Sequence, residues 1–360
     1  MRVGIALPTL ANGDAVGNDA LGMGQRLRQR GLDVYFFAAT VCDVREPVRR
    51  LDEIPKVLRS SDDILIYHHS IGCEAVVRAM ERLSLRRKVV KYHNVTPPQF
   101  FVSLNRQVAD GCREGQEQLA RLIQTGAHFW ADSEFNALDI RQLAPHLEVT
   151  ALPPFHQVDD LFRHEADARA VVGFDDWTTT FLVVGRVVPN KNIPLAVQTL
   201  AAYRQQYDDK ARLVVAGSWP LPDYASQLCQ CIHDLGQEGH VFVTGNVTVS
   251  QLKALYLTAD ALLVTSHHEG FCVPLVEAMA LRIPVVAVPH AAIPYTGGPA
   301  VCYAPPRPNA LAAALARLVL QDPAAREEQI WRGWQRYETC FSTAAITRQF
   351  DVLFDRLLAS

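Results

Sequence analysis

Two glutamates that stand eight residues apart are well placed to bind hydroxyl groups. They are Glu269 and Glu277 in the run HHEGFCVPLVEAMA (267–280). A carboxylate accepts hydrogen bonds from both hydroxyls of a diol, which is how a ribose or another sugar is commonly held. The same spacing also occurs in ordinary helices with solvated glutamates, so these two residues alone leave both interpretations open.

The segments around this run predict a loop at the edge of a parallel sheet. The apolar stretches 259–266 and 282–288 have the length and composition of buried strands. Ligands bind at the carboxyl ends of such strands. Gly270 allows a tight turn, and Pro274 suits the first turn of a helix that begins near 274. Free N–H groups at a helix N-terminus suit phosphate or sugar oxygens. The residues expected to contribute here are Phe271, Cys272 and Val273, with Ser266 at the strand end.

A second segment, FLVVGRVVPNKNIPLAVQTL (181–200), combines two cations with a glycine between a strand and a helix. The strand is expected to end at Gly185, and Arg186 and Lys191 lie in the loop that follows. Two cations beside a backbone that a ligand can approach closely form a plausible clamp for a diphosphate. As isolated residues they would more simply be solvated surface charges.

Together these segments resemble the retaining glycosyltransferases of family 4, which have the GT-B fold. The order and spacing of the matching pieces extend through most of the chain. The resemblance implies an α/β protein with two Rossmann-like βαβ domains that face each other across a cleft, and a C-terminal helix that crosses back to the first domain. The pieces are GRVVPNKN (185–192) for the donor-phosphate loop, 241–287 for the nucleotide and sugar region, and PTLANGDAVGND (8–19) for the amino-terminal loop.

The resemblance also implies roles for the matching residues. Arg186 and Lys191 would clamp the donor diphosphate and stabilise the leaving group, as the spacing itself suggests. Glu269 would bind hydroxyls of the donor sugar and Glu277 the ribose, while His93, just after a predicted strand, would face the donor sugar. The remaining expected donor contacts are Gly185, Asn246, Val247 and Gly270.

The amino-terminal loop departs from the family pattern. A helix beginning near Asn18 would bring Gly17 and the Asn18 amide against the donor phosphates. Family members often have two adjacent glycines here, whereas this chain has Ala15 and Val16 before Gly17. The loop therefore offers one glycine, Gly17, beside the Asn18 amide for the expected phosphate contact.

Length and composition predict two domains. A chain of 360 residues with 49% hydrophobic residues can build two cores of about 170 residues each. The proline-containing segment 151–162 resembles the family's interdomain linker, which predicts a first domain of 1–165 plus about 341–360 and a second of 166–340. Strands are expected near 2–8, 33–38, 63–67, 88–92, 128–131 and 148–151, then near 180–184, 212–216, 240–243, 261–265, 284–287 and 300–303.

Charge and cysteine patterns exclude several classes. The halves 1–165 and 166–360 carry formal charges of −1 and −2, so neither is a nucleic-acid-binding domain by bulk charge. No apolar run is long enough to span a bilayer, and the first residues lack a signal-peptide pattern. The eight cysteines form no CxxC pair and lie mostly in apolar segments, so we expect reduced, buried thiols in a cytoplasmic protein. No metal site and no cofactor are expected.

The expected function is transfer of a hexose from a UDP- or GDP-sugar to a saccharide or polyprenyl-linked saccharide. Resemblance favours a place in surface-polysaccharide or lipopolysaccharide assembly. Basic runs at 45–50 and 82–88 would touch anionic headgroups if the protein contacts the inner membrane peripherally, and otherwise form solvated faces. A non-catalytic nucleotide-sugar-binding protein and a nucleotide-sugar epimerase remain open. The motif set disfavours the epimerase and also a sugar phosphorylase. The Gly22-x-Gly24 pair is a poor dinucleotide fingerprint because it lacks a third glycine and lies within a predicted helix.

Overall fold

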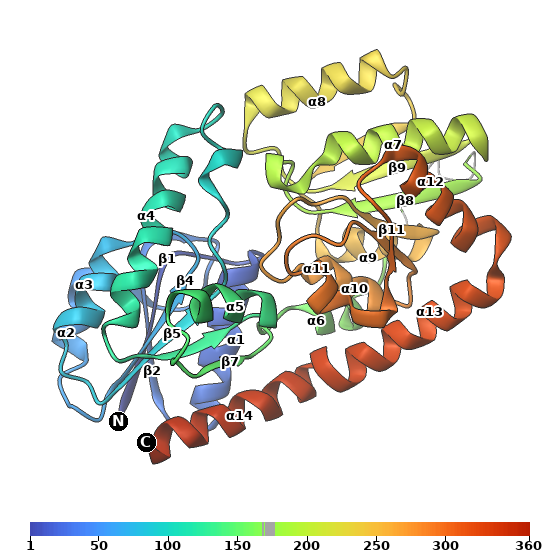
Figure 1. The fold of residues 1–360 in the computed structure, drawn as a ribbon. Helices are drawn as coiled ribbons and strands as arrows, with labels where there is room; N and C mark the ends of the chain where they lie inside the picture. The colour runs from blue at the N-terminus through green and yellow to red at the C-terminus, as the bar shows by residue number, and fades with distance from the viewer. Residues whose placement is uncertain (168, 170–176) are drawn as a thin grey trace. The chain divides into compact units, whose positions relative to one another are not determined.

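The structure is a computed structural model that describes residues 1–167, 169 and 177–360, and the chain divides into two compact units (Figure 1). Unit 1 contains Met1–Gln157 and Ser342–Ser360, and unit 2 contains Val158–Phe341. The sequence analysis placed the division at 165/166 instead. The difference is the short helix α6 (Val158–Arg163), whose first residue packs into the core of unit 2.

Unit 1 is built on a seven-stranded parallel sheet in the order β3-β2-β1-β4-β5-β6-β7. The strand β4 is buried along its whole length, as expected for a parallel sheet that helices cover on both faces. The order reverses between β1 and β4, so polar side chains after these strands meet at one edge. The strands are β1 (Arg2–Ala11), β2 (Asp33–Cys42), β3 (Val48–Arg49), β4 (Ile64–His69), β5 (Arg87–Tyr92), β6 (His128–Ala131) and β7 (Val149–Ala151).

Several helices of unit 1 begin at polar capping residues. Asp14 caps α1, Asn105 caps α4 and Ser133 caps α5, each by accepting a hydrogen bond from a backbone N–H in the first turn. Gly22 and Gly24, the failed dinucleotide fingerprint, lie inside α1 where a Cβ would collide with core phenylalanines. The helices are α1 (Ala15–Gln29), α2 (Ile54–Val57), α3 (Glu74–Arg82), α4 (Arg106–Ile123), α5 (Glu134–Leu143) and α14 (Thr343–Ala359), with 3₁₀ turns η1 (Leu51–Glu53) and η2 (Pro98–Phe100).

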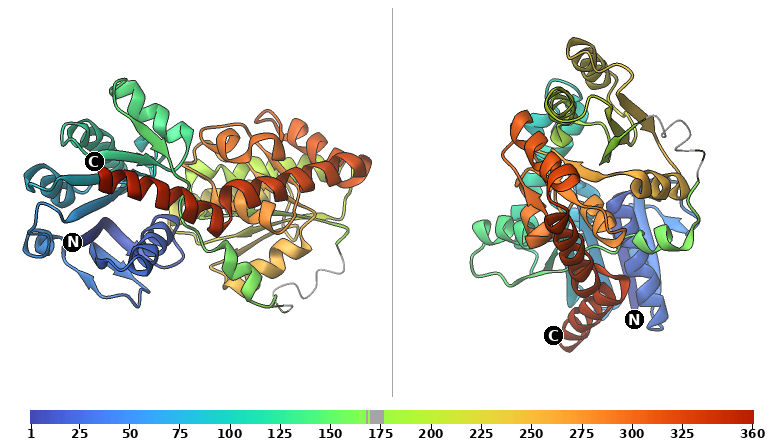
Figure 2. Two further views of the ribbon diagram at one scale, coloured as in Figure 1. Left: turned by 90° about the horizontal axis from the view of Figure 1, so that it is seen from below. Right: turned by 90° about the vertical axis from the view of Figure 1, so that its right-hand side faces the viewer.

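The last helix, α14, belongs to unit 1 although it is far from the rest of that unit in sequence (Figure 2). Phe350 and Phe354 are fully buried in the core that β1 and α1 share. Arg26 on α1 donates to both carboxylate oxygens of Asp351, at 2.9 and 2.5 Å. The return of the C-terminal helix to the first unit is therefore confirmed.

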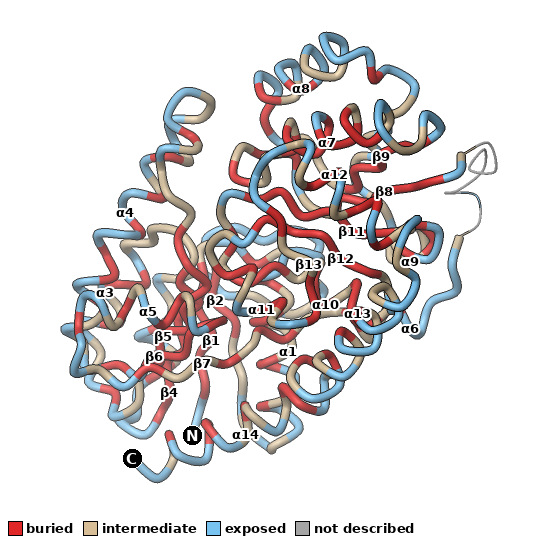
Figure 3. Tube along the Cα trace, turned by 45° about the vertical axis from the view of Figure 1, so that its right-hand side comes forward, coloured by how far each residue is buried: buried red, intermediate tan, exposed pale blue. Residues whose placement is uncertain are grey.

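Unit 2 contains a six-stranded parallel sheet in the order β10-β9-β8-β11-β12-β13. Figure 3 shows that its central strands are buried, while the helices that cover them are exposed on their outer sides. The order reverses between β8 and β11, which makes this pair the switch point of the sheet. The strands are β8 (Thr179–Val184), β9 (Ala211–Ala216), β10 (Val241–Gly245), β11 (Ala261–Val264), β12 (Val285–Ala287) and β13 (Cys302–Tyr303).

The helices of unit 2 follow its strands in the alternation expected for βαβ units. Two π-helical segments interrupt the C-terminal helices, and the second joins α13 to α14. The segments are α6, η4 (Pro189–Lys191), α7 (Ile193–Gln206), α8 (Pro222–Asp234), α9 (Val249–Thr258), α10 (Val273–Ala280), α11 (Ile293–Gly297), η5 (Gly298–Ala300), α12 (Pro308–Ala316), η6 (Arg317–Gln321), α13 (Pro323–Arg336) and η7 (Tyr337–Phe341).

The predicted strands are confirmed to within a few residues, and the fold class is α/β as expected. The sequence analysis missed β3, a two-residue edge strand that is too short to show a pattern. The helix expected near Asn18 begins at Ala15 because Asp14 caps it, so that predicted start is wrong. The helix expected near 274, with Pro274 in its first turn, begins at Val273 and is confirmed.

Candidate functional site

The two loops that carry the predicted site of unit 2 leave neighbouring strands. β8 and β11 are paired in the parallel sheet, with Leu262 opposite Leu182. Their carboxyl ends therefore lie at the same edge, at the switch point of strand order. A cavity between the two loops is lined by Gly185, Lys191, Ser266 and Glu269, among others. These four predicted residues are thus brought together.

The backbone after β8 passes very close to the backbone after β9. A Cβ on Gly217 would lie 2.0 Å from the carbonyl oxygen of Gly185, so only glycine fits there. The Gly185 N–H donates to the Ala216 carbonyl and the Val187 N–H to the Ser218 carbonyl. These contacts fix the backbone of the loop after β8. The 3₁₀ turn η4 then places Lys191 at the wall of the cavity.

Lys191, Glu269 and Ser266 form a hydrogen-bonded group. Lys191 Nζ donates to Glu269 Oε1 at 2.6 Å, and Ser266 Oγ donates to the same oxygen at 2.7 Å. Burial lowers the pKa of Lys191, but the Glu269 carboxylate offsets this, and the pKa of Lys191 is raised overall. The lysine is therefore charged at neutral pH. The second oxygen of Glu269 accepts no hydrogen bond from the described residues and can accept one from a ligand hydroxyl.

Asn190 and Thr265 join the two loops directly. The Asn190 carbonyl accepts hydrogen bonds from the N–H groups of His267 and His268, at 2.8 and 3.2 Å. The Thr265 hydroxyl lies within hydrogen-bond distance of the Lys191 and Asn192 carbonyls. Because this network fixes both backbones, it also fixes the position of Lys191 relative to Glu269.

Glu277 lies on α10, about one turn beyond the helix start. Its Oε2 accepts a hydrogen bond of 2.7 Å from the Tyr256 hydroxyl. Burial raises the pKa of Glu277, while the hydrogen bond from Tyr256 and the charge of Lys191 oppose that shift. The sequence analysis did not single out Tyr256, which orients this carboxylate from the neighbouring helix α9.

The N-terminus of α10 offers unpaired backbone donors. Cys272 takes a left-handed conformation with φ of 74°, and no side chain caps the helix. Within the described part of the chain, no carbonyl or side chain accepts from the N–H groups of Phe271, Cys272 and Val273. Gly270 precedes them in the same loop. Such donors, at the positive end of a helix, suit an anion or sugar oxygens.

The remaining predicted residues of unit 2 lie at the same sheet edge. Asn246 and Val247 directly follow β10, and Gly217 bridges to Gly245 at its end. Arg186 is exposed. Its positive charge opposes in part the overall rise in the pKa of Lys191. It forms no ion pair with any residue that the structure describes. Arg186 is therefore a cation that an anionic ligand can reach.

Gly17, Asn18 and His93 lie in unit 1. The Gly17 N–H donates to the side chain of Asp14, and the Asn18 N–H donates to the Asp14 carbonyl. A Cβ on Gly17 would lie 1.9 Å from the Ala11 carbonyl oxygen. The structure thus explains this glycine by close packing of α1 on the end of β1, which is a different reason from the phosphate contact expected from the sequence.

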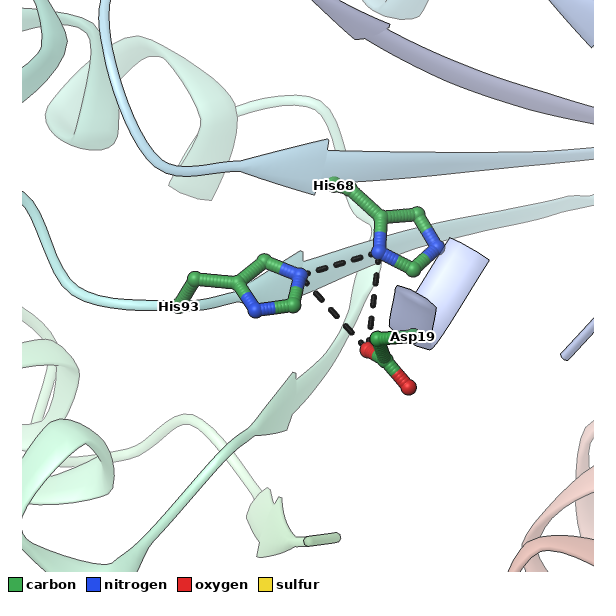
Figure 4. Close-up of side chains that lie close together, drawn as sticks. All are labelled: Asp19, His68 and His93. Atoms are coloured by element: carbon green, nitrogen blue, oxygen red, sulfur yellow. Dashed lines mark hydrogen bonds and ion pairs between the residues drawn. The ribbon is translucent and has the colours of Figure 1, made fainter. Parts of the chain in front are cut away.

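His93 is part of a buried polar cluster at the carboxyl ends of three adjacent strands of unit 1 (Figure 4). Its Nδ1 lies 2.8 Å from Asp132 Oδ2, and its Nε2 lies 2.9 Å from His68 Nδ1. Asp19 Oδ2 faces both rings, at 3.6 Å from His93 Nε2 and 3.5 Å from His68 Nδ1. Lys91 donates to Asp132 Oδ1 at 2.5 Å.

Burial perturbs the titration of this cluster. It raises the pKa of Asp19 to about 6, against the opposing charge of Lys91. Burial also lowers the pKa of His68 well below its ordinary value. The sequence analysis named only His93 here. The signal that could have found the others is that His68, His93 and Asp132 each stand at the end of a predicted strand, where side chains of parallel neighbours converge.

Most cysteines are less buried than expected, and arginines of the basic run 45–50 form ion pairs. None of the eight cysteines, all of which lie in the described residues, forms a disulfide. Only Cys112 and Cys272 are buried, so the prediction of buried thiols is wrong for the other six. In the basic run 45–50, Arg49 pairs with Glu53 and Arg50 with Asp52. None of the helices in the described ranges is long and apolar enough to cross a membrane.

The two parallel α/β units define the GT-B fold. The structure of HepE from Anabaena, solved in complex with UDP, superposes on 99% of this chain with a TM-score of 0.78 and 15% identity, and all of that chain is covered. Residues 165–333 match the family model of glycosyl transferases group 1.

Two relatives match by sequence in a shorter region. An uncharacterized glycosyltransferase of Methanocaldococcus jannaschii is 34% identical over 33% of this chain, and the O-antigen chain mannosyltransferase RfbU of Salmonella typhimurium is 36% identical over 29%. The matched segments are 29% and 28% of the lengths of those relatives. The chain therefore spans less than a third of either relative in these matches.

Proposed function

We propose that the chain is a retaining glycosyltransferase that transfers a hexose from a UDP- or GDP-sugar to a saccharide acceptor. The observation that carries the proposal is the group formed by Lys191, Glu269 and Ser266 at the carboxyl ends of β8 and β11. It combines a charged amine, an open carboxylate oxygen and a neighbouring helix N-terminus. This is the chemistry that a sugar diphosphate requires.

The donor diphosphate would lie against the N-terminus of α10. Arg186 and Lys191 supply two positive charges there, and the N–H groups of Cys272 and Val273 supply hydrogen bonds. Together they would stabilise the charge that grows on the diphosphate as the glycosidic bond breaks. Because side chains and backbone dipoles provide this stabilisation, the transfer itself is proposed to be independent of a metal ion.

The sugar and ribose would be held by the two glutamates. The free oxygen of Glu269 would accept from donor-sugar hydroxyls, and Glu277, oriented by Tyr256, would accept from the ribose diol. Asn246 and Val247 would face the base. The roles of Gly17, Asn18 and His93 in holding the donor are proposed from resemblance alone, since their amides and ring nitrogens have partners within unit 1.

Retention would follow a front-face route. The bond between the sugar C1 and the phosphate oxygen breaks, the acceptor oxygen bonds to C1 on the same face, and its proton passes to the departing phosphate oxygen. Glu269 is engaged by Lys191 and Ser266, which suits it to binding hydroxyls more than to nucleophilic attack.

The acceptor is proposed to be a saccharide or polyprenyl-linked saccharide in surface-polysaccharide or lipopolysaccharide assembly. The match to an O-antigen chain mannosyltransferase supports this assignment. The place of action would be the cytoplasm, with peripheral contact at the inner membrane. The arginines of the run 45–50 that already pair with acidic neighbours would contribute little to that contact.

A thermal-shift screen with UDP, GDP, ADP and their sugar conjugates tests the donor site. A nucleotide present at 100 times its dissociation constant stabilises the protein by about 2.7 kcal/mol. We expect a shift with UDP or GDP that is reduced in Glu277→Ala and kept in Glu327→Ala, an exposed glutamate on α13. No shift with any nucleotide would contradict the proposal.

Activity is tested with the nucleotide that binds. Incubation of its sugar conjugate with saccharide acceptors should give a product whose anomeric configuration, measured by NMR, matches that of the donor. Inversion would refute the retaining route. Conversion of the donor into a sugar epimer would point to the epimerase, and binding without turnover would point to the non-catalytic protein.

A further inference from the structure

We propose that Asp19, His68 and His93 form a binding site in unit 1 for a divalent transition-metal ion of the Zn²⁺ type (Figure 4). The three residues come from α1, from β4 and from the segment directly after β5. Two imidazole nitrogens and one carboxylate oxygen are ligands that Zn²⁺ prefers. All three residues lie in unit 1, whereas Lys191 and Glu269 lie in unit 2.

The distances between the ligand atoms fit one metal ion. His68 Nδ1, His93 Nε2 and Asp19 Oδ2 form a triangle with sides of 2.9, 3.5 and 3.6 Å. Ligands about 2.1 Å from a tetrahedral Zn²⁺ stand about 3.4 Å apart. A metal ion just outside the plane of this triangle would reach all three atoms, and its fourth position would remain for water or another small ligand.

One ligand atom has no hydrogen-bond partner. Asp19 Oδ2 is buried and receives no hydrogen bond, whereas Asp19 Oδ1 accepts from the Phe155 N–H at 2.8 Å. A buried carboxylate oxygen without a partner is costly. It points at the two ring nitrogens, which is where a cation would satisfy it.

The surrounding residues orient the ligands as in known metal centres. Asp132 Oδ2 lies 2.8 Å from His93 Nδ1, so this nitrogen donates and leaves Nε2 with a free lone pair. A carboxylate behind a ligating histidine fixes its tautomer and raises its basicity. Lys91 is the nearby cation that would oppose metal binding, but Asp132 balances its charge at 2.5 Å, and its Nζ lies 3.9 Å from Asp19 Oδ2.

The competing occupant of this space is a proton shared between the two rings. The 2.9 Å separation of the ring nitrogens also fits an N–H···N hydrogen bond. That arrangement leaves Asp19 Oδ2 at 3.5 Å or more from both rings. The metal ion accounts for all three inward-facing atoms at once, which is why we favour it.

The test measures zinc bound to the full chain. The protein is dialysed against a chelator, reloaded with ZnCl₂, desalted and assayed for zinc by mass spectrometry. Wild type should retain close to one ion per chain, and so should His233→Ala, which removes an exposed histidine. Asp19→Asn keeps an acceptor for the Phe155 N–H but loses the anionic ligand, and it should retain none. Asp132→Asn should weaken Zn²⁺ affinity by about 10- to 100-fold.

A second measurement records the visible absorption of the wild-type protein and of Asp19→Asn after loading with Co²⁺. Replacement of Zn²⁺ by Co²⁺ should give visible absorption bands of a site with nitrogen and oxygen ligands, and Asp19→Asn should lack them. Equal zinc content in wild type and Asp19→Asn, with no such bands in wild type, would overturn the proposal and leave the shared proton as the occupant.

Discussion

The ion pair between Lys191 and Glu269 should stabilise unit 2 as well as prepare it for a donor. Removing one partner of a buried pair leaves the other charge uncompensated and costs about 3–5 kcal/mol. Here the Lys191 side chain is 18% exposed and that of Glu269 is 9% exposed. Because solvent screens such a pair in part, we expect Lys191→Met to cost about 3 kcal/mol, at the lower end of that range.

A double-mutant cycle isolates the interaction. Lys191→Met, Glu269→Gln and the double variant should give a coupling free energy of about 2 kcal/mol at neutral pH, since the double variant leaves no buried charge.

Hydrogen exchange by mass spectrometry is the suitable assay, because it reports the opening free energy of each unit separately. Peptides from β8 and β11 should exchange faster in the single variants, whereas unit 1 peptides serve as the internal control. A coupling free energy below about 0.5 kcal/mol would refute the reasoning, because the effects of mutations at distant, non-interacting sites are additive only to within about that margin.

Three further predictions concern single residues. Gly17→Ala should destabilise unit 1 by about 2 kcal/mol, measured by urea denaturation, because its Cβ would lie 1.9 Å from the Ala11 carbonyl oxygen; unchanged stability would show that the loop yields easily. Burial raises the pKa of Glu277, so nucleotide affinity measured by calorimetry should be constant at high pH and should weaken as pH falls through that raised value. A pH-independent affinity would separate Glu277 from the ribose. The hydrogen bond from Arg26 lowers the pKa of Asp351, so the stabilisation is present above the ordinary carboxyl pKa and is lost as pH falls through the lowered value. Asp351→Asn should therefore cost about 1 kcal/mol at pH 7 and little in strong acid; an equal cost at both would refute the charge-based explanation.

The strands and the unit 2 loops could be predicted from the sequence because their signals are local. Buried parallel strands give continuous apolar runs, and Gly185, Lys191 and Glu269 lie in motifs of fixed spacing. Their convergence followed from the rule that ligand-binding loops leave the carboxyl ends of strands. The structure adds that Lys191 and Glu269 are paired directly.

The features that sequence reasoning missed depend on packing between distant segments. The ends of two predicted strands signal His68 and His93, but Asp19 meets them only through the packing of α1, which no local pattern encodes. The Tyr256 hydrogen bond to Glu277 likewise joins two helices. The partial or full exposure of six cysteines was missed because an apolar segment does not specify which face of an element is covered.

A crystal structure of the protein with the nucleotide sugar that gives the largest thermal shift tests the central claim most directly. The account predicts the diphosphate at the N-terminus of α10, in contact with Arg186 and Lys191, with the ribose hydroxyls on Glu277 and a donor-sugar hydroxyl on Glu269. A nucleotide bound away from the β8 and β11 loops, or with its diphosphate out of reach of both cations, would contradict it.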